Sequence, residues 1–129
     1  DAGGRTYVSV GERAWARRAA AQSLKARNTL FEAGGRRSTI EWRVKRGPGR
    51  PIPYAVIVRF LTSSDDGRKG EVLVVSRVTS MTTCHMAYID ALANPEGMAL
   101  ARRIADEQAA TFDCSSEPVV EGHPGQSPL

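Results

Sequence analysis

The sequence lacks any uninterrupted apolar run long enough to cross a lipid bilayer as a helix, which takes about 20 residues. Its opening residues also lack the charged start and apolar middle of a secretory signal peptide, an absence that says nothing about the compartment in which the protein works. The 41% of hydrophobic residues nevertheless suffice for a core, and 129 residues fit one domain. We therefore expect a globular domain without a transmembrane segment.

Cysteine is scarce, with two residues in the whole chain, Cys84 and Cys114. Their spacing excludes the closely spaced pairs of redox motifs and zinc sites. Each lies at the end of an expected secondary-structure element, so we predict a structural disulfide between them. Two buried free thiols in a cytosolic protein are the alternative. A disulfide favours a periplasmic or secreted location, because cytosolic thiols are kept reduced.

Histidine is equally scarce, and we find no catalytic or cofactor-binding motif. His85 follows Cys84 directly, but neighbours on a strand point to opposite faces, which argues against a nucleophile pair. The other histidine, His123, lies far along the chain, so a metal site would lack ligands. The glycine-containing stretches match neither common phosphate-loop pattern. We therefore predict no catalytic residue, no metal site and no cofactor. A small enzyme whose site forms only in the fold remains an alternative.

Acidic residues are few in the first half of the chain. Residues 1–60 contain 13 Lys or Arg and 4 Asp or Glu, whereas residues 61–129 contain 5 and 10, so the halves carry +9 and −5 within a total of +4. A basic half attracts acidic proteins, anionic surfaces or nucleic acid.

The basic residues are densest in a run that contains Gly49-Arg50-Pro51. Gly-Arg-Pro hooks enter the minor groove of DNA, but Pro48 stands where such a hook needs an arginine, so the run is more simply a hairpin tip. Aromatic residues make up 6% of the chain and do not interleave with the run, which leaves a stacking platform for bases unsupported. Our candidates for binding an anion or a partner are Arg36, Arg37, Arg43, Lys45, Arg46 and Arg50.

Several stretches have the pattern of β-strands. Apolar and charged side chains alternate over residues 39–45, which is typical of a half-buried strand. Further strands are expected at residues 54–61 and 71–78, and the second of these is apolar enough to lie centrally. Residues 84–89 favour a fourth strand, with a helix as the alternative. The short connections predict an antiparallel meander.

Residues 95–113 predict an amphipathic helix. Asn94 is a good N-cap, and Pro95 suits the first helical position, where its missing N–H is not needed. Apolar residues recur at three- and four-residue steps and predict one apolar face. On the opposite side, Arg102 is placed to pair with Asp106.

An N-terminal helix is expected over residues 11–26. Ser9 and Glu12 match the capping-box pattern that begins many helices, and the alanines that follow favour helix formation. Residues 23–32 overlap the end of this segment and alternate in a way that fits a strand equally well.

The fold class that follows is α+β. A three- or four-stranded antiparallel meander would pack against the C-terminal amphipathic helix, with a further helix at the N-terminus. We divide the chain into a flexible lead-in (residues 1–8), a single domain (residues 9–114) and a C-terminal tail (residues 115–129). We expect a non-enzymatic, periplasmic or secreted domain that binds an acidic protein or an anionic surface. A basic nucleic-acid-binding domain is a further alternative, and the sequence does not indicate an oligomeric state.

Overall fold

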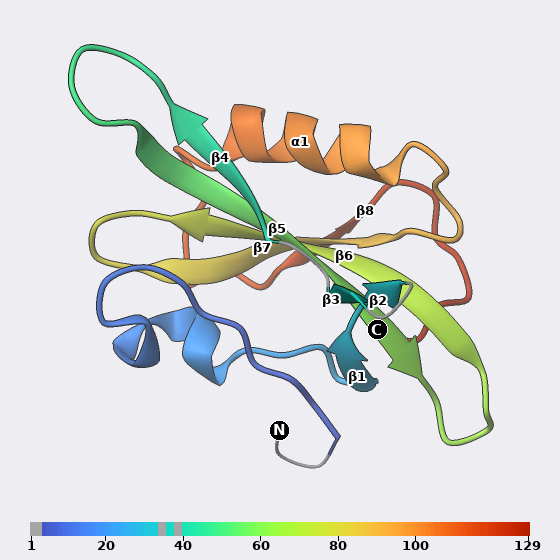
Figure 1. Cartoon of the computed structure of the whole chain (residues 1–129). Helices are drawn as coiled ribbons and strands as arrows, with labels where there is room; N and C mark the ends of the chain where they lie inside the picture. Colours follow the sequence, from blue (N-terminus) through green and yellow to red (C-terminus); the bar gives the residue numbers. More distant parts are fainter. Residues whose placement is uncertain (1–3, 34–35, 38–39) are drawn as a thin grey trace.

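The computed structural model describes residues 4–33, 36–37 and 40–129. These residues form an α+β fold with one six-stranded, mostly antiparallel sheet, a separate two-stranded hairpin, one α-helix and two 3-10 turns (Figure 1). The strands are β1 (Arg27–Leu30), β2 (Glu32–Ala33), β3 (Arg36–Arg37), β4 (Glu41–Lys45), β5 (Ile52–Ser63), β6 (Lys69–Val78), β7 (Thr83–Asp90) and β8 (Val119–Glu121). The helical segments are η1 (Ala14–Ala16), η2 (Arg18–Ala21) and α1 (Gly97–Gln108).

The sheet is larger than the three or four strands expected from the sequence. Its order is β1–β5–β6–β7–β8, and β4 pairs with β5 as well. Strands β1 and β4 pair with different parts of β5, residues 60–63 and 52–57. The additional strands are short: β1 has four residues and β8 has three, too few for a clear periodic pattern. The segment 84–89, for which strand and helix were both considered, belongs to strand β7.

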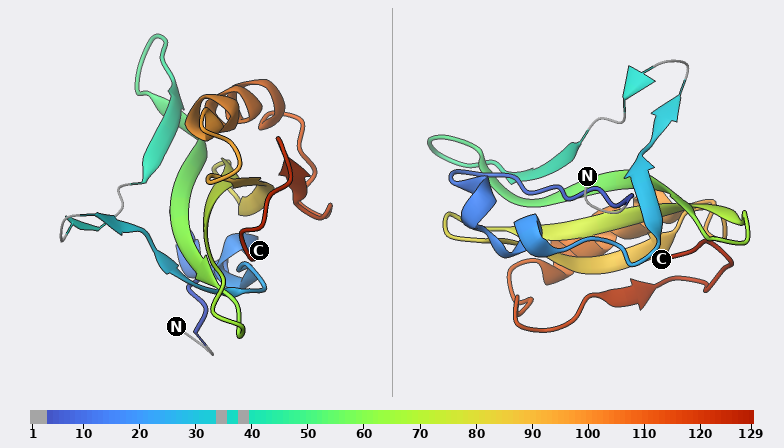
Figure 2. Two further views of the ribbon diagram at one scale, coloured as in Figure 1. Left: turned by 90° about the vertical axis from the view of Figure 1, so that its right-hand side faces the viewer. Right: turned by 90° about the horizontal axis from the view of Figure 1, so that it is seen from below.

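The central strands β5 and β6 are apolar on both faces. Since neighbouring residues of a strand point to opposite sides, such strands need a cover on each side of the sheet. Figure 2 shows the resulting layers, with α1 on one face and the N-terminal segment on the other. Side chains that face α1 include Ala55, Ile57, Leu73 and Val75, and those that face the N-terminal segment include Val56, Val58, Val72 and Val74.

Helix α1 covers its face with small and branched apolar side chains. Ala101, Ile104 and Ala105 are buried in the same cluster as the facing residues of β5, β6 and β7. The helix lies within the expected range 95–113 but is shorter. The predicted disulfide is confirmed: it joins Cys84 of β7 to Cys114, which follows α1, with the two Cα atoms 5.8 Å apart.

The N-terminal cover, residues 4–24, contains no α-helix, so the predicted helix over residues 11–26 is wrong. Turns η1 and η2 are separated by Arg17, whose backbone is extended. Gly11 and Arg13 both have positive φ, 103° and 54°, which a right-handed helix does not tolerate. The hydroxyl of Ser9 donates to the carbonyl oxygen of Ala14 and forms no cap. Alanine propensity is a weak preference, and tertiary contacts override it here.

Both ends of the described chain contact the sheet. The backbone N–H of Thr6 donates to the side chain of Asn28 in β1 at 3.0 Å. Within residues 115–129, β8 runs parallel to β7, and Ser127 donates to the buried carboxylate of Asp90 through its N–H and its hydroxyl. The expected lead-in and tail thus include residues that hydrogen-bond to the domain.

Candidate functional site

A groove of about 850 Å³ runs beside β7 and β8, on the face of the sheet that carries the N-terminal cover. Paired residues of neighbouring strands point to the same face, so Tyr88 of β7 and Val120 of β8 lie side by side at its floor. One wall is formed by residues 21–25 and the other by residues around Glu117. The groove exists because the N-terminal cover does not extend over β8 (Figure 2, right).

Three cationic side chains line this groove: Arg5, Arg18 and Lys25. The guanidinium of Arg5 donates to the backbone carbonyl of Lys25 at 3.0 Å, which fixes the two residues beside each other. Among the described residues, none of the three cations forms an ion pair with a carboxylate. Glu117 is the one acidic side chain among the described residues that line the groove, and the main chain of Leu129 lies there as well. An excess of positive charge therefore borders an apolar floor.

The floor rests on a hydrogen bond between Tyr88 and His85, with the Oη and Nδ1 atoms 2.7 Å apart. Residues three apart on a strand normally face opposite sides, but the register of β6 and β7 shifts between Val75 and Ser76 and places them on one face. Burial lowers the pKa of His85 to about 4. Burial, together with the nearby Glu117, raises the pKa of Tyr88 to about 12. Both groups are therefore neutral near pH 7.

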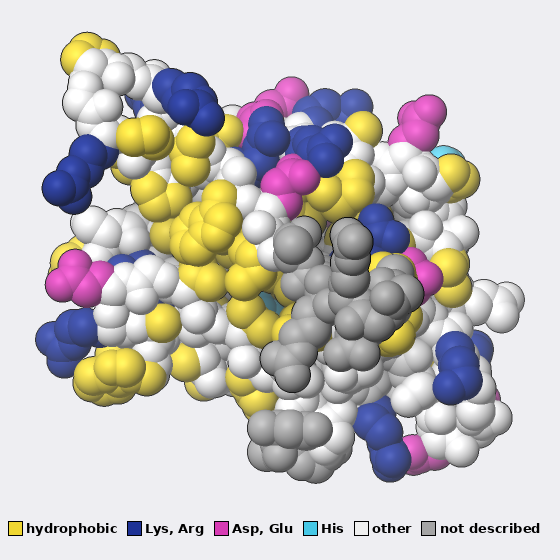
Figure 3. Space-filling view, in the orientation of Figure 1, with side chains coloured by type: hydrophobic (Ala, Val, Ile, Leu, Met, Phe, Trp, Pro, Cys, Tyr) yellow, Lys and Arg dark blue, Asp and Glu magenta, His cyan; other side chains and the backbone are white. Residues whose placement is uncertain are grey.

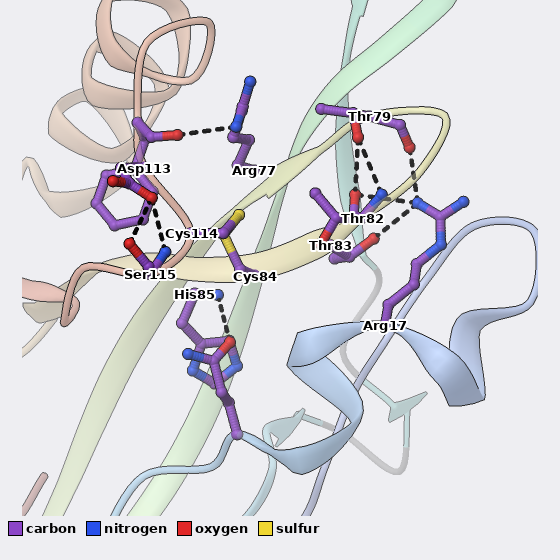
Figure 4. The surroundings of a disulfide bond; sticks show 12 residues. Arg17, Arg77, Thr79, Thr82, Thr83, Cys84, His85, Asp113, Cys114 and Ser115 are labelled. Carbon is purple, nitrogen blue, oxygen red and sulfur yellow. Dashed lines mark hydrogen bonds between the residues drawn. A yellow bond between two sulfur atoms is a disulfide. The ribbon is translucent and has the colours of Figure 1, made fainter.

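His85 and its neighbour Cys84 serve different faces of the sheet. Cys84 is bonded to Cys114 on the side of α1, whereas the side chain of His85 lies toward the N-terminal cover (Figure 4). The backbone N–H of His85 donates to the side chain of Gln22 at 2.8 Å. Gln22 also lines the groove, so this bond positions the groove wall against β7.

Among the predicted binding residues, Arg43 is bound within the molecule. Its Nε and Nη2 atoms lie 3.0 and 2.7 Å from the carboxylate oxygens of Asp106, which also accepts a hydrogen bond from the hydroxyl of Tyr54. These hydrogen bonds, led by that of Arg43, hold the pKa of Asp106 below its ordinary value. The expected pair of Arg102 with Asp106 is wrong, because Arg102 binds both carboxylate oxygens of Glu41 in β4.

Three of the other predicted residues lie away from the groove. Lys45, Arg46 and Arg50 are exposed at the tip of the β4–β5 hairpin, where Figure 3 shows Lys and Arg side chains. Arg36 and Arg37 form β3, but their side chains lie outside the described residues. The structure therefore brings four of the six candidates, Arg43 included, to one hairpin, and none of these four lines the groove.

Sequence reasoning did not find the groove because its residues come from separate segments. Arg5, Arg18 and Lys25 are dispersed over residues 5–25, and Tyr88 and Val120 belong to strands β7 and β8, which α1 separates in the sequence. None of them belongs to a local motif. The high Arg and Lys content of the first half was the available signal, and it favoured the densest run instead.

Comparisons with protein-family models, with curated proteins and with solved structures find no match. Within the described ranges, no three His, Cys, Asp or Glu side chains come together in a way that could hold a metal ion. No helix in that part of the chain is both long and apolar enough to cross a membrane. A functional assignment therefore depends on the geometry and charge of the surface.

Proposed function

We propose that the protein is a non-enzymatic binding domain whose groove holds an acidic segment of a partner protein. The observation that carries the proposal is the set of three cations, Arg5, Arg18 and Lys25, without carboxylate partners in the described chain, beside an apolar floor. The three cations attract carboxylates electrostatically, even before contact. The apolar floor can bury apolar side chains that lie between those carboxylates in the partner.

An extended peptide suits this surface better than a compact ligand. The groove is open to solvent, and β8 borders it as a short strand that no other strand pairs with on its outer side among the described residues. Val119 and Val120, on opposite faces of β8, are 50% and 51% exposed. An exposed apolar edge of this kind is suited to pairing with an extended segment of another chain.

The chemistry of the floor also favours binding over catalysis. Tyr88 and His85 bind each other, and the pKa of each, about 12 and about 4, lies far from neutrality. A general acid or base works best when its pKa is close to the operating pH. The Cys84–Cys114 disulfide supports a periplasmic or secreted location, where such bonds persist.

The test measures the affinity for a fluorescein-labelled ten-residue peptide of alternating Glu and Val by anisotropy at low salt. Reversing two charges in the variant Arg18→Glu/Lys25→Glu should weaken binding roughly tenfold or more, since two attractive rim contacts become repulsive. Added salt should weaken the wild-type complex as well, because these charges are exposed.

The matched control is Arg46→Glu/Arg50→Glu, which makes the same change in net charge at the β4–β5 hairpin, away from the groove. We expect it to keep most of the affinity, and we expect a peptide of alternating Lys and Val not to bind. Equal losses in the two double variants would show that net charge alone governs binding and would refute the groove. Absence of binding between the wild-type protein and the acidic peptide would refute the proposed function.

A further inference from the structure

Two loops that lie far apart in the sequence are joined by one buried arginine. Arg17 is 6% exposed, and its Nε atom donates to the carbonyl oxygen of Glu12 at 2.8 Å. In the turn between β6 and β7, its Nη1 atom donates to the carbonyl oxygen of Thr79 at 2.7 Å (Figure 4). Its Nη2 atom donates to the carbonyl oxygen of Ser80 at 3.1 Å. The loop formed by residues 11–16 and the turn formed by residues 79–82 are therefore held as one unit.

The first of these loops contains an unfavourable backbone conformation. Arg13 is the one residue other than glycine with positive φ among those that the structure describes, at φ 54° and ψ 46°. Such a conformation costs an arginine energy and persists where the surroundings enforce it, often at functional positions. The surroundings here include Gly11, where an added Cβ atom would lie 2.7 Å from the guanidinium carbon of Arg17.

The enforced conformation presents a tryptophan to solvent. Trp15 is 74% exposed, and the guanidinium carbon of Arg13 lies 5.2 Å from its ring centre, a cation–π contact. Hydrophobic side chains protrude over η1 in the space-filling view (Figure 3). Nothing in the packing of the described core uses this ring, because Trp15 belongs to none of the hydrophobic clusters.

The second loop presents a methionine in the same way. Met81 is 85% exposed and follows Ser80, whose carbonyl Arg17 binds. Trp15 and Met81 are the two most exposed large hydrophobic side chains of the described chain, and they lie on the two loops that Arg17 joins. We call these two residues, with Arg13, the Trp15–Met81 tip.

We infer that the Trp15–Met81 tip docks the domain on an anionic lipid surface. Tryptophan favours the interface between water and membrane, and methionine adds flexible apolar area. Arg13, beside the ring, forms no ion pair in the part of the chain that the structure describes, and the whole chain carries +4. The apolar side chains and the positive charge both contribute, since interfacial binding scales with buried apolar area and with attraction to anionic lipids. Glu12 opposes this attraction with a single charge.

This inference goes beyond the proposed function, because the tip and the groove are different surfaces and lipid docking requires no peptide. Trp15 and Met81 are already exposed, so they can enter the headgroup layer without a change in the fold. A protein pocket that receives Trp15 would be the competing occupant, and binding to pure lipid separates the two.

The experiment uses the full chain carrying Trp42→Phe, which leaves Trp15 as the one remaining tryptophan of the two. Vesicles of phosphatidylcholine with about one third phosphatidylglycerol should shift the emission of Trp15 to shorter wavelength, and brominated lipid should quench it. Co-sedimentation should be weaker with pure phosphatidylcholine and at high salt. Replacing both apolar residues, in Trp15→Ser/Met81→Ser, should lower binding by roughly tenfold.

Two controls make the result specific. Ile52 is 64% exposed at the start of β5, so Ile52→Ser removes a comparable apolar side chain elsewhere and should leave binding unchanged. Arg13→Gly removes both the cation and the backbone strain, so it should raise the melting temperature while weakening vesicle binding. That opposite response separates a docking role from a stabilising one.

Unchanged Trp15 emission on addition of anionic vesicles would overturn the inference, as would equal losses in Ile52→Ser and in the double serine variant. The acidic peptide should still bind to Trp15→Ser/Met81→Ser, because neither residue lines the groove. A failure of lipid docking is thereby distinguishable from a failure of the groove.

Discussion

Helix α1 and the N-terminal cover bury the two apolar faces of the sheet in different ways. Helix α1 places a regular apolar stripe against β5, β6 and β7, and a disulfide fixes its far end. The N-terminal cover also buries apolar side chains, among them Val10 and Leu24, and it is fixed by hydrogen bonds that Arg17 donates and that Gln22 accepts. A regular element is held by burial and one covalent bond, whereas an irregular one needs directed polar contacts.

The difference matters for function because both proposed surfaces belong to the irregular cover. A segment without a helix can stop short of β8, which leaves the floor of the groove uncovered. It can also place Arg13 in a left-handed conformation and present Trp15. Binding surfaces commonly lie on irregular segments that a rigid scaffold supports.

Removing the disulfide, in Cys84→Ser/Cys114→Ser, tests the helix cover and should have the largest effect. The bond spans 30 residues of sequence, for which the chain-entropy model gives about 3.5 kcal/mol of stability. Urea unfolding should show this loss, and the remaining folded protein should still bind the acidic peptide. An unchanged melting temperature after verified reduction would contradict the role of the bond as a clamp.

Replacing Arg17 tests the other cover and should cost nearly as much. Arg17→Met keeps the apolar stem but leaves the partly buried carbonyl oxygens of Thr79 and Ser80 without the donors that Arg17 supplies, which we expect to cost about 3 kcal/mol. Arg17→Lys should rescue little of this loss, because one ammonium cannot replace the fork of donors. The neighbour Arg18 is exposed, so Arg18→Met should change the unfolding free energy by less than about 0.5 kcal/mol.

The position of helix α1 could largely be predicted from the sequence, whereas the structure of the N-terminal cover could not. A helix was expected across residues 95–113, where apolar residues recur with helical spacing, and α1 lies inside that range. The α+β class and the Cys84–Cys114 bond are confirmed. The N-terminal helix failed because the contacts of Arg17 with residues 79–82 are long-range, and no local pattern encodes them.

The groove was even harder to predict from the sequence than the N-terminal cover. Charge density along the chain favoured the β4–β5 hairpin, but in the fold Arg43 is bound by Asp106, and the groove draws its cations from dispersed positions such as Arg5 and Lys25. Tyr88 and His85 meet through an irregular register between β6 and β7, which an alternating pattern does not predict. The sequence indicated that the binding surface would be positively charged, but the position of that surface depends on the fold.

A pH titration sharpens the contrast, because His85 faces the N-terminal cover. Its folded pKa, about 4, is below its ordinary value of 6.5, so between these values the unfolded chain binds a proton that the folded protein does not. Stability should therefore fall as the pH falls through this window, by roughly 2 kcal/mol between pH 7 and 4.5. His85→Gln should flatten this slope, whereas His123→Gln, at an exposed position, should keep it. A wild-type protein with constant stability over this range would argue against a buried, neutral His85.

The smallest expected effect concerns the exposed hydrogen bonds that join β4 to the helix cover. Asp106→Asn should lower stability by about 0.5 kcal/mol, because Arg43 and Tyr54 lose a charged acceptor on a solvent-exposed surface. The pKa of Asp106 is lowered from 3.8, so its contribution is present above that pH and is lost as the pH falls below it. The difference between the variant and the wild type should accordingly shrink in acid and in high salt.

Glu107→Gln changes the same charge one position along α1 and should have no such effect, since Glu107 pairs with no described cation. A loss of several kcal/mol in Asp106→Asn would instead mean that the helix cover, like the N-terminal one, depends on directed polar contacts.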